Sequence, residues 1–193
     1  PTYGHVPMIL GEDGKRLSKR HGALGVREYQ SLGILPEALK NYLLRLGWSL
    51  GDDEIFTGED MKKSFLSGIL NKSPATFSMD KLLWFNKYYL DQMSVDKLID
   101  ALSIEEFDGS EYSKIILNTI RDRCSTLNEF SSNAGYFFKD PKNYDEALII
   151  KHCKEDSFEH LSLLREKFEE LRNWEQIYIK EVIDKVVADF EIG

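Results

Sequence analysis

The chain has 193 residues, of which 42% are hydrophobic and 30% charged, enough to bury one substantial core or two small ones. No apolar run reaches the ~20 residues of a membrane-spanning helix, and no signal-peptide pattern opens the chain, which predicts a cytoplasmic protein without a membrane partner. Cys124 and Cys153 lie far apart without histidines at ligand spacing, and this indicates reduced thiols rather than a disulfide framework or a metal site. Because the first residue is not methionine, we expect a fragment or a processed product.

The net charge of −8 is distributed unevenly. Residues 1–45 hold seven Lys and Arg against four Asp and Glu, a local charge of +3, so the remaining residues carry −11. The acidic total argues at first against a nucleic-acid partner. A local basic patch on an acidic, soluble body can nevertheless bind phosphate.

The first half of the chain predicts a mixture of elements. Residues 5–10 form an apolar stretch that predicts a short strand, and the glycines of "GEDG" suit a turn at 11–14. Between this turn and Pro36 we expect a loop that contains one short helix. Pro36 then suits the first position of a helix that Gly47 ends, with Leu35, Leu39, Leu43 and Leu46 on one stripe. Two further helices are expected, over 57–66 after a Thr57–Asp60 capping pattern and over 79–93 after Ser78.

The second half is helical throughout. Apolar residues recur at threes and fours, which predicts helices over 94–102, 110–130, 144–153, 156–173 and 174–190. The predicted fold is mainly α. A small α+β domain with a short strand and turn occupies residues 1–100, and an all-α domain occupies residues 101–193.

One segment has the positive charge and the flexibility expected of a loop that binds a charged substrate. "DGKRLSKRHG", residues 13–22, places Lys15, Arg16, Lys19 and Arg20 around Ser18, with glycines near both ends. Arginine forks grip phosphate oxygens in pairs, and a lysine ammonium supplies a movable charge, so this loop suits a polyphosphate. The charge pattern alone favours a solvated basic turn. The Walker spacing of a P-loop is missing.

The residues around this loop resemble a known family. The sequence from His5 to Phe56 is similar to the region around the KMSKS signature of bacterial glutamyl-tRNA synthetases, and the similarity continues through residues 72–90 and 134–148. The KMSKS element appears here as Arg16-Leu17-Ser18-Lys19-Arg20, with Arg at a first position that is usually Lys. The long collinear similarity makes the resemblance specific.

The resemblance implies a class I aminoacyl-tRNA synthetase that activates glutamate with ATP and transfers it to the 3′ end of tRNA-Glu. It implies a catalytic role for Lys19, which would stabilise the leaving pyrophosphate, within an ATP-binding set of Arg16, Leu17, Ser18, Lys19 and Arg20. Mg²⁺ is expected to bind together with ATP, and no metal site is expected within the chain itself. The protein is expected to be a monomer.

The HIGH signature of the family does not occur in the chain. The resemblance therefore implies that the nucleotide-binding domain, which would bind most of the ATP and the glutamate, lies N-terminal to Pro1. The chain would then hold the KMSKS loop and stem-contact domain in residues 1–100 and a truncated helical anticodon-binding domain in residues 101–193. Alone, it is expected to be inactive.

Two groups of residues are candidates for contact with tRNA, which needs cations and exposed rings. Arg121 and Arg123 are the candidate cations, although the charge pattern favours a salt-bridged helix surface beside Asp122 and Glu129. Aromatic residues could stack on bases, but their helical spacing favours the core, and we predict a core position for Trp84. The aromatic candidates are Trp48, Trp84, Tyr88 and Tyr89.

Three alternatives remain open. A glutaminyl-tRNA synthetase reads the anticodon with β-barrels, whereas residues 101–193 have helical periods. A truncated paralogue that glutamylates a modified base of tRNA-Asp would lack an anticodon domain altogether. A non-catalytic helical module that binds RNA or protein would have no need of the basic loop.

Overall fold

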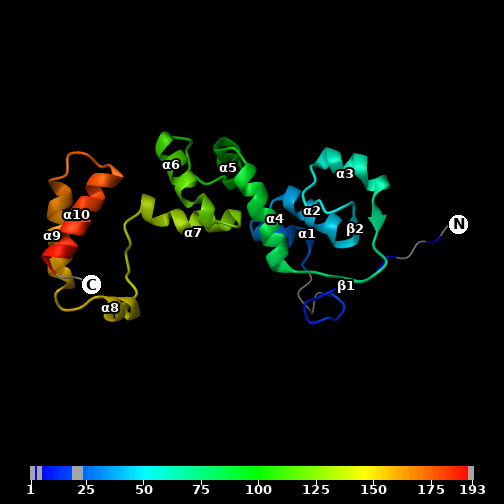
Figure 1. Ribbon diagram of the computed structural model, residues 1–193, viewed down its shortest axis with the longest axis horizontal. Coiled ribbons are helices and arrows are strands. Elements are labelled where there is room, and N and C mark those ends of the chain that lie inside the picture. The colour runs from blue at the N-terminus through cyan, green and yellow to red at the C-terminus, as the bar shows by residue number, and fades with distance from the viewer. Residues whose placement is uncertain (1–2, 4–5, 19–23, 191–193) are drawn as a thin grey trace. The chain divides into compact units, whose positions relative to one another are not determined.

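The computed structural model describes residue 3, residues 6–18 and residues 24–190 (Figure 1). The chain divides into two compact units, Pro1–Asp140 and Pro141–Gly193, and each is described by itself. Helices dominate the described residues and the strands are short, so the predicted mainly α fold with a small α+β part is confirmed. None of the helices in this part of the chain is long and apolar enough to cross a membrane.

The first unit contains two small two-stranded sheets. Strand β1 (Ile9–Leu10) pairs in parallel with β4 (Ala75–Thr76), and β2 (Trp48–Ser49) pairs antiparallel with β3 (Ile69–Leu70). The strand predicted over residues 5–10 is shorter in the structure, because β4 offers β1 only two partner residues. The same two-residue pairing nevertheless joins the start of the unit to a segment more than sixty residues later.

The first four helices are α1 (Val26–Ser31), α2 (Pro36–Gly47), α3 (Gly58–Ser64) and α4 (Met79–Gln92). Their starts follow the predicted signals. Pro36 occupies the first turn of α2, where its missing N–H costs nothing. The Thr57 hydroxyl accepts from the N–H of Asp60, and the Ser78 hydroxyl accepts from the N–H of Lys81.

Helices α2 and α4 pack against each other and form much of the core of the first unit (Figure 1). The buried stripe of α2 includes Leu39, Tyr42 and Leu46, and Leu35, directly before the helix, is buried as well. The predicted stripe placed Leu43 in this set, and this was wrong: Leu43 is 45% exposed. Position 42 lies on the buried face instead because its phenol packs edge-on against Phe77 with ring centroids 5.3 Å apart.

The rest of the first unit is formed by α5 (Val95–Leu102), α6 (Glu111–Ile120) and α7 (Leu127–Phe138). The single helix predicted over 110–130 was wrong, because two helices share this range. A 3₁₀ turn at Arg121–Arg123 ends α6, and Cys124 is extended. The Thr126 hydroxyl then accepts from the N–H of Glu129, which starts a new helix where the apolar period alone shows no break.

One cluster of buried side chains runs from Tyr29 in α1 to Ala134 in α7. The domain boundary expected between residues 100 and 101 falls inside α5, within this first unit. As a division between functional domains, that boundary stays a prediction. Cys124 belongs to the cluster, and burial raises the pKa of its thiol.

The second unit consists of α8 (Glu146–His152), α9 (Ser157–Glu169) and α10 (Gln176–Asp189), with α9 packed against α10. The helices follow the predicted periods, but most of the predicted apolar stripes are not buried. Within this unit's described residues only Val186 is fully buried, and Phe158 and Trp174 are 66% and 64% exposed. Three short helices offer too little surface to bury two apolar faces completely.

Candidate functional site

The described half of the basic loop projects from a tight turn. The backbone N–H of Gly11 donates to the carbonyl of Lys15 at 2.8 Å, and the N–H of Leu17 donates to the carbonyl of Ile9 at 2.9 Å. Gly14, with φ of +72°, allows the turn between them. These bonds fold the chain back on β1, so that Arg16 leaves the turn beside Leu10, with which it forms an isolated bridge.

The side chains of this turn face in two directions. Lys15 and Arg16 are exposed, whereas Leu17 is half-buried and packs against the core. Lys15 lies 3.9 Å from the carboxylate of Asp13, a pair too exposed to hold the ammonium firmly. Leu17 therefore anchors the loop while the two cations stay available to solvent. Lys19 and Arg20 lie outside the described residues.

Strand β4 holds the base of the loop. Beyond the two paired residues of β1 and β4, the N–H of Phe77 donates to the carbonyl of Leu10 at 2.8 Å, and the N–H of Ala75 to that of Met8 at 3.3 Å. Helix α4 begins at Met79, directly after this pairing. The base of the loop is thus fixed to the N-terminal end of α4.

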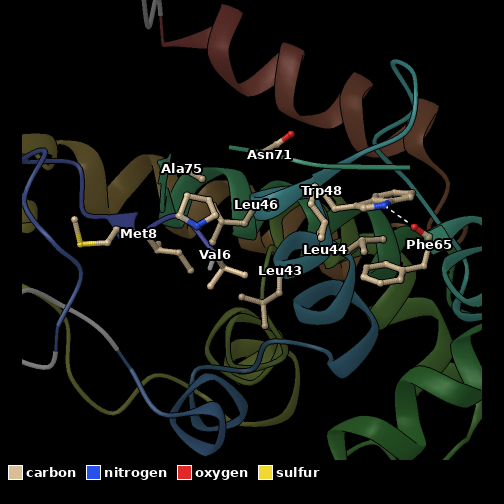
Figure 2. A pocket seen from close by; sticks show the side chains of 13 residues that line it. Val6, Met8, Leu43, Leu44, Leu46, Trp48, Phe65, Asn71 and Ala75 are labelled. Carbon is tan, nitrogen blue, oxygen red and sulfur yellow. Dashed lines mark hydrogen bonds between the residues drawn. The ribbon is translucent and has the colours of Figure 1, made fainter. Parts of the chain in front are cut away.

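An apolar cavity of about 300 Å³ lies beside β1 (Figure 2). Its lining comes from the segment that leads into β1, from α2 and from β2 and its neighbours; among the lining side chains are those of Val6, Met8, Leu43, Trp48, Phe65 and Ala75. The Trp48 indole N–H donates to the carbonyl of Phe65 at 3.0 Å, the dashed line of Figure 2. Among the described residues no charged side chain lines the cavity, and this lining is unsuited to a polyphosphate.

The two predicted cations of the helical region differ in their surroundings. The Nη1 of Arg121 donates to the carbonyls of Asp91 and Met93, at 3.2 and 2.8 Å, and the Nε and Nη2 of Arg121 are buried. Arg123 is exposed, and in the described part of the chain its side chain has no hydrogen-bond or ion-pair partner. The structure brings the two arginines into one 3₁₀ turn, but only Arg123 presents its charge to solvent.

The core position predicted for Trp84 was wrong, because its side chain is 51% exposed. Trp84 stacks on Tyr88 with ring centroids 6.5 Å apart and ring planes 28° apart. Trp48 is 1% exposed, and the Tyr89 hydroxyl donates to the carbonyl of Phe56 at 2.9 Å, so these two aromatics are structural. The phase of α4 explains the difference, since Leu82, Phe85 and Leu90 occupy the buried face.

Sequence reasoning missed two buried asparagines, Asn41 on α2 and Asn86 on α4. Both side chains are fully buried, and each forms three hydrogen bonds to groups distant in sequence. The available signal was a polar residue inside the apolar stripe of Leu82, Asn86 and Leu90. A buried amide on such a stripe must be paired to be tolerated.

An ion cluster supports the start of α4. The carboxylate of Glu54 lies 3.2 Å from the Nε of Arg45 and 3.1 Å from the Nζ of Lys81. Partial desolvation alone would raise the pKa of Glu54, but the hydrogen bonds from Lys81 and Arg45 outweigh it and lower that pKa. Arg45 and Lys81 are therefore paired within the fold and have a structural role.

Comparison with family models accounts for both parts of the chain. Residues 1–84, which hold the basic loop, match the family model described as tRNA synthetases class I (E and Q), catalytic domain. Residues 82–193 match the model described as Anticodon binding domain. The two matches follow each other along the chain and meet in α4. The first part of the chain is therefore similar to the catalytic domain of class I (E and Q) tRNA synthetases, and the chain, more than half of which matches the second model, belongs to the anticodon-binding domain family.

Two solved structures are similar over the whole chain. One is a glutamate tRNA ligase from Elizabethkingia meningosepticum CCUG26117 in complex with its amino acid, 25% identical with a TM-score of 0.80. The other is a glutamate-tRNA synthetase from Elizabethkingia anophelis, 24% identical with a TM-score of 0.73. All of this chain is covered in both comparisons, and it spans 43% of each of the two relatives.

Proposed function

We propose that this chain is the part of a glutamate–tRNA ligase that supplies the KMSKS loop and the tRNA-facing surfaces. One observation carries the proposal: the exposed cations of the loop lie within residues matched by the class I (E and Q) catalytic domain, and a helical anticodon-binding region follows them. The solved relatives named as glutamate tRNA ligases support the choice of glutamate.

In the proposed reaction, a carboxylate oxygen of glutamate attacks the α-phosphorus of ATP. The bond from that phosphorus to the oxygen bridging the β-phosphorus breaks, and pyrophosphate leaves with the electron pair. The ammonium of Lys19 compensates the negative charge that grows on the departing pyrophosphate. A ribose hydroxyl at the 3′ end of tRNA-Glu then attacks the carbonyl carbon and loses its proton, and AMP departs.

We assign the neighbouring residues supporting roles. Arg16 and Arg20 would hold phosphate oxygens with their guanidinium forks, and Ser18 would add a hydroxyl donor. The half-buried Leu17 would fix the loop against the core. In the described part of the chain, no three His, Cys, Asp or Glu side chains cluster so as to hold a metal ion. Mg²⁺ would accompany ATP, and as a hard cation it would suit phosphate oxygens and water as ligands.

For tRNA we propose two contacts on the first unit. Arg123 would contact a backbone phosphate, because its guanidinium is exposed and unpaired within the described residues. The stacked pair Trp84 and Tyr88 would receive an unstacked base or a ribose, because its ring faces are held in place and half-exposed. Arg121, which sequence reasoning paired with Arg123, is occupied by carbonyls of the first unit.

Among the alternatives, a glutaminyl-tRNA synthetase is the strongest, since the catalytic-domain family includes both enzymes. The regular elements of residues 101–190 are helices and one 3₁₀ turn, which favours the glutamate enzyme over one with anticodon-binding β-barrels. The match to an anticodon-binding domain argues against the truncated paralogue. The presence of the basic loop argues against a non-catalytic module, which would have no need of it.

The test replaces Lys19 by Ala in the complete enzyme and measures glutamate-dependent exchange of pyrophosphate into ATP, with tRNA-Glu present. Loss of one donor to a developing negative charge should slow adenylate formation by about a hundredfold or more. The control is Lys62→Ala, a 77% exposed side chain on α3 that pairs with Glu59. Undiminished exchange in the Lys19 variant would contradict the proposal, and so would exchange by the 193-residue chain alone. Charging of tRNA-Gln beside tRNA-Glu decides the substrate range.

A further inference from the structure

The side chain of Asn86 joins three segments of the first unit. Its Oδ1 accepts from the N–H of Leu35 at 2.7 Å, and its Nδ2 donates to the carbonyls of Gly33 at 3.2 Å and Ser125 at 2.7 Å. The residue is fully buried at the middle of α4. Both amide hydrogens are therefore used, one toward the loop between α1 and α2 and one toward the segment that leads into α7.

Direct contacts between those two segments complete what we call the joint, consisting of residues 31–35, Asn86 and residues 125–128. The N–H of Leu127 donates to the carbonyl of Gly33 at 3.0 Å, and the Nδ2 of Asn128 donates to the carbonyl of Ser31 at 2.8 Å. Gly33 has a φ of +78°, and a Cβ on it would lie 2.8 Å from the backbone N of Leu127. The two segments thus lie too close for any side chain at position 33.

Asn86, the central residue of the joint, lies on α4, and the base of the basic loop is paired with β4, directly before that helix. The chain enters the loop from β1, which is paired with β4 directly before α4. After the loop it continues into α1, which ends at Ser31, the first residue of the joint. Both chain segments that border the loop are consequently tied to α4, one at its start and one at its middle. The third partner, α7, lies wholly within the residues matched by the anticodon-binding domain.

We propose that Asn86 is a positioning residue, which holds helix α7 and the segment after the basic loop in one fixed arrangement so that anticodon contacts on the helical region orient the loop for reaction. The inference rests on the proposed function. Truncation of the Asn86 side chain leaves the Ser125 carbonyl and the Leu35 N–H without their partner and removes one of the two donors to the Gly33 carbonyl, so the segments must shift to satisfy these groups. Displacements of about 1 Å at a reacting centre can cost about a hundredfold in rate, so small shifts suffice.

The chain contains a matched control in Asn41. It is also fully buried, and its Nδ2 donates to the carbonyl of Glu54 at 2.8 Å. Its Oδ1 accepts from the N–H of Phe56 at 2.8 Å and, at 2.9 Å, from the Tyr89 hydroxyl, whose proton it shares with the Phe56 carbonyl. It therefore has the same residue type, burial and number of hydrogen bonds. None of its partners belongs to the joint.

The experiment uses the complete ligase and compares Asn86→Ala with Asn41→Ala. For each protein, kcat/KM is measured for tRNA-Glu and for the same tRNA with its anticodon replaced, and the ratio of the two values is the anticodon penalty. Thermal unfolding is recorded in parallel. We expect both variants to unfold at lower temperature, but only Asn86→Ala should reduce the anticodon penalty, by about fivefold, whereas Asn41→Ala should stay within about twofold of the wild type.

A second variant covers the case in which Asn86→Ala does not fold. Asn128→Ala removes the exposed outer bond of the joint and should reduce the anticodon penalty in the same direction by a smaller factor. An unchanged penalty in the folded joint variants overturns the inference, as does an equal reduction in Asn41→Ala or a wild type without any penalty. A wild type that charges no tRNA overturns the proposed function instead, and the two failures are therefore distinguishable.

Discussion

The guanidinium of Arg121 donates a 2.8 Å hydrogen bond to the backbone carbonyl of Met93, at the C-terminal end of α4. In return, the Nζ of Lys87 on α4 donates to the carbonyl of Arg121 at 3.2 Å. These bonds fasten the 3₁₀ turn that follows α6 to the end of α4. A cation at a helix C-terminus also opposes the partial negative charge of the exposed carbonyls there. The side chain of Arg121 therefore has a structural role rather than a role in binding tRNA.

Replacing Arg121 by Ala should lower the free energy of unfolding by about 1–3 kcal/mol, because carbonyls at the end of α4 lose their partner. Urea unfolding of the 193-residue chain measures the effect. Arg123→Ala, in the same turn, should change stability by less than about 0.5 kcal/mol, since its side chain is exposed. Equal losses in the two variants would contradict the distinction between them.

Arg123 should matter for tRNA instead. In the complete ligase, Arg123→Ala should reduce the slope of log affinity against log salt by about one, the change expected when one phosphate contact is lost. The measurement is a titration of labelled tRNA-Glu at several salt concentrations. A variant with weaker binding but an unchanged slope would show that Arg123 does not contact a phosphate.

The two tryptophans of the first unit should separate binding from stability. Trp84→Ala in the complete ligase should raise KM for tRNA by about tenfold, because one stacked base is worth about 1–3 kcal/mol. Its unfolding temperature should change little, since about half of the side chain is exposed. Trp48→Ala should instead cost about 3–5 kcal/mol of stability, as expected for an almost fully buried indole. A large loss of stability in Trp84→Ala would argue for a structural role of the Trp84–Tyr88 pair.

The environment of Asp108 predicts that the stability of the chain depends on pH in the acidic range. Hydrogen bonds from the side chain and backbone N–H of Ser110, and then from the Ser113 hydroxyl, lower its pKa from 3.8 to about 2. The folded chain thus binds this proton less readily than the unfolded chain, so the contribution to stability is complete above about pH 4 and is lost as the pH falls toward 2. At pH 6 Asp108→Asn should unfold at lower temperature than the wild type, and the two curves should converge near pH 2. A constant difference between them would contradict this account.

Any residue with a side chain at position 33 should destabilise the protein. Gly33→Ala should destabilise the chain by more than about 1 kcal/mol, because the residue needs a positive φ and the new Cβ meets the backbone of Leu127 and Asn128 at 2.8 Å. Gly58→Ala is the control, since Gly58 begins α3 with an ordinary φ and open space around its Cα. Thermal unfolding of the two variants should give opposite or at least clearly different shifts.

Local sequence patterns were sufficient to predict the positions of most of the helices. Pro36, Thr57 and Ser78 start helices through interactions with residues at most three positions away, so the chemistry that fixes those starts is visible in a short window. The basic loop was visible for the same reason, since its charges are consecutive in the sequence. Its family resemblance and the mainly helical fold were available at this level as well.

Only the tertiary structure decided which side chains face solvent and which segments meet. Trp84 and Leu43 each share an apolar pattern with buried neighbours, and the phase of the helix against its partner places them outside the core. Arg121 and Arg123 are equivalent as charges, and their difference arises from carbonyls about thirty residues earlier in the chain. The role of Asn86 is defined by groups 51, 53 and 39 residues away, and no local pattern records contacts over such separations.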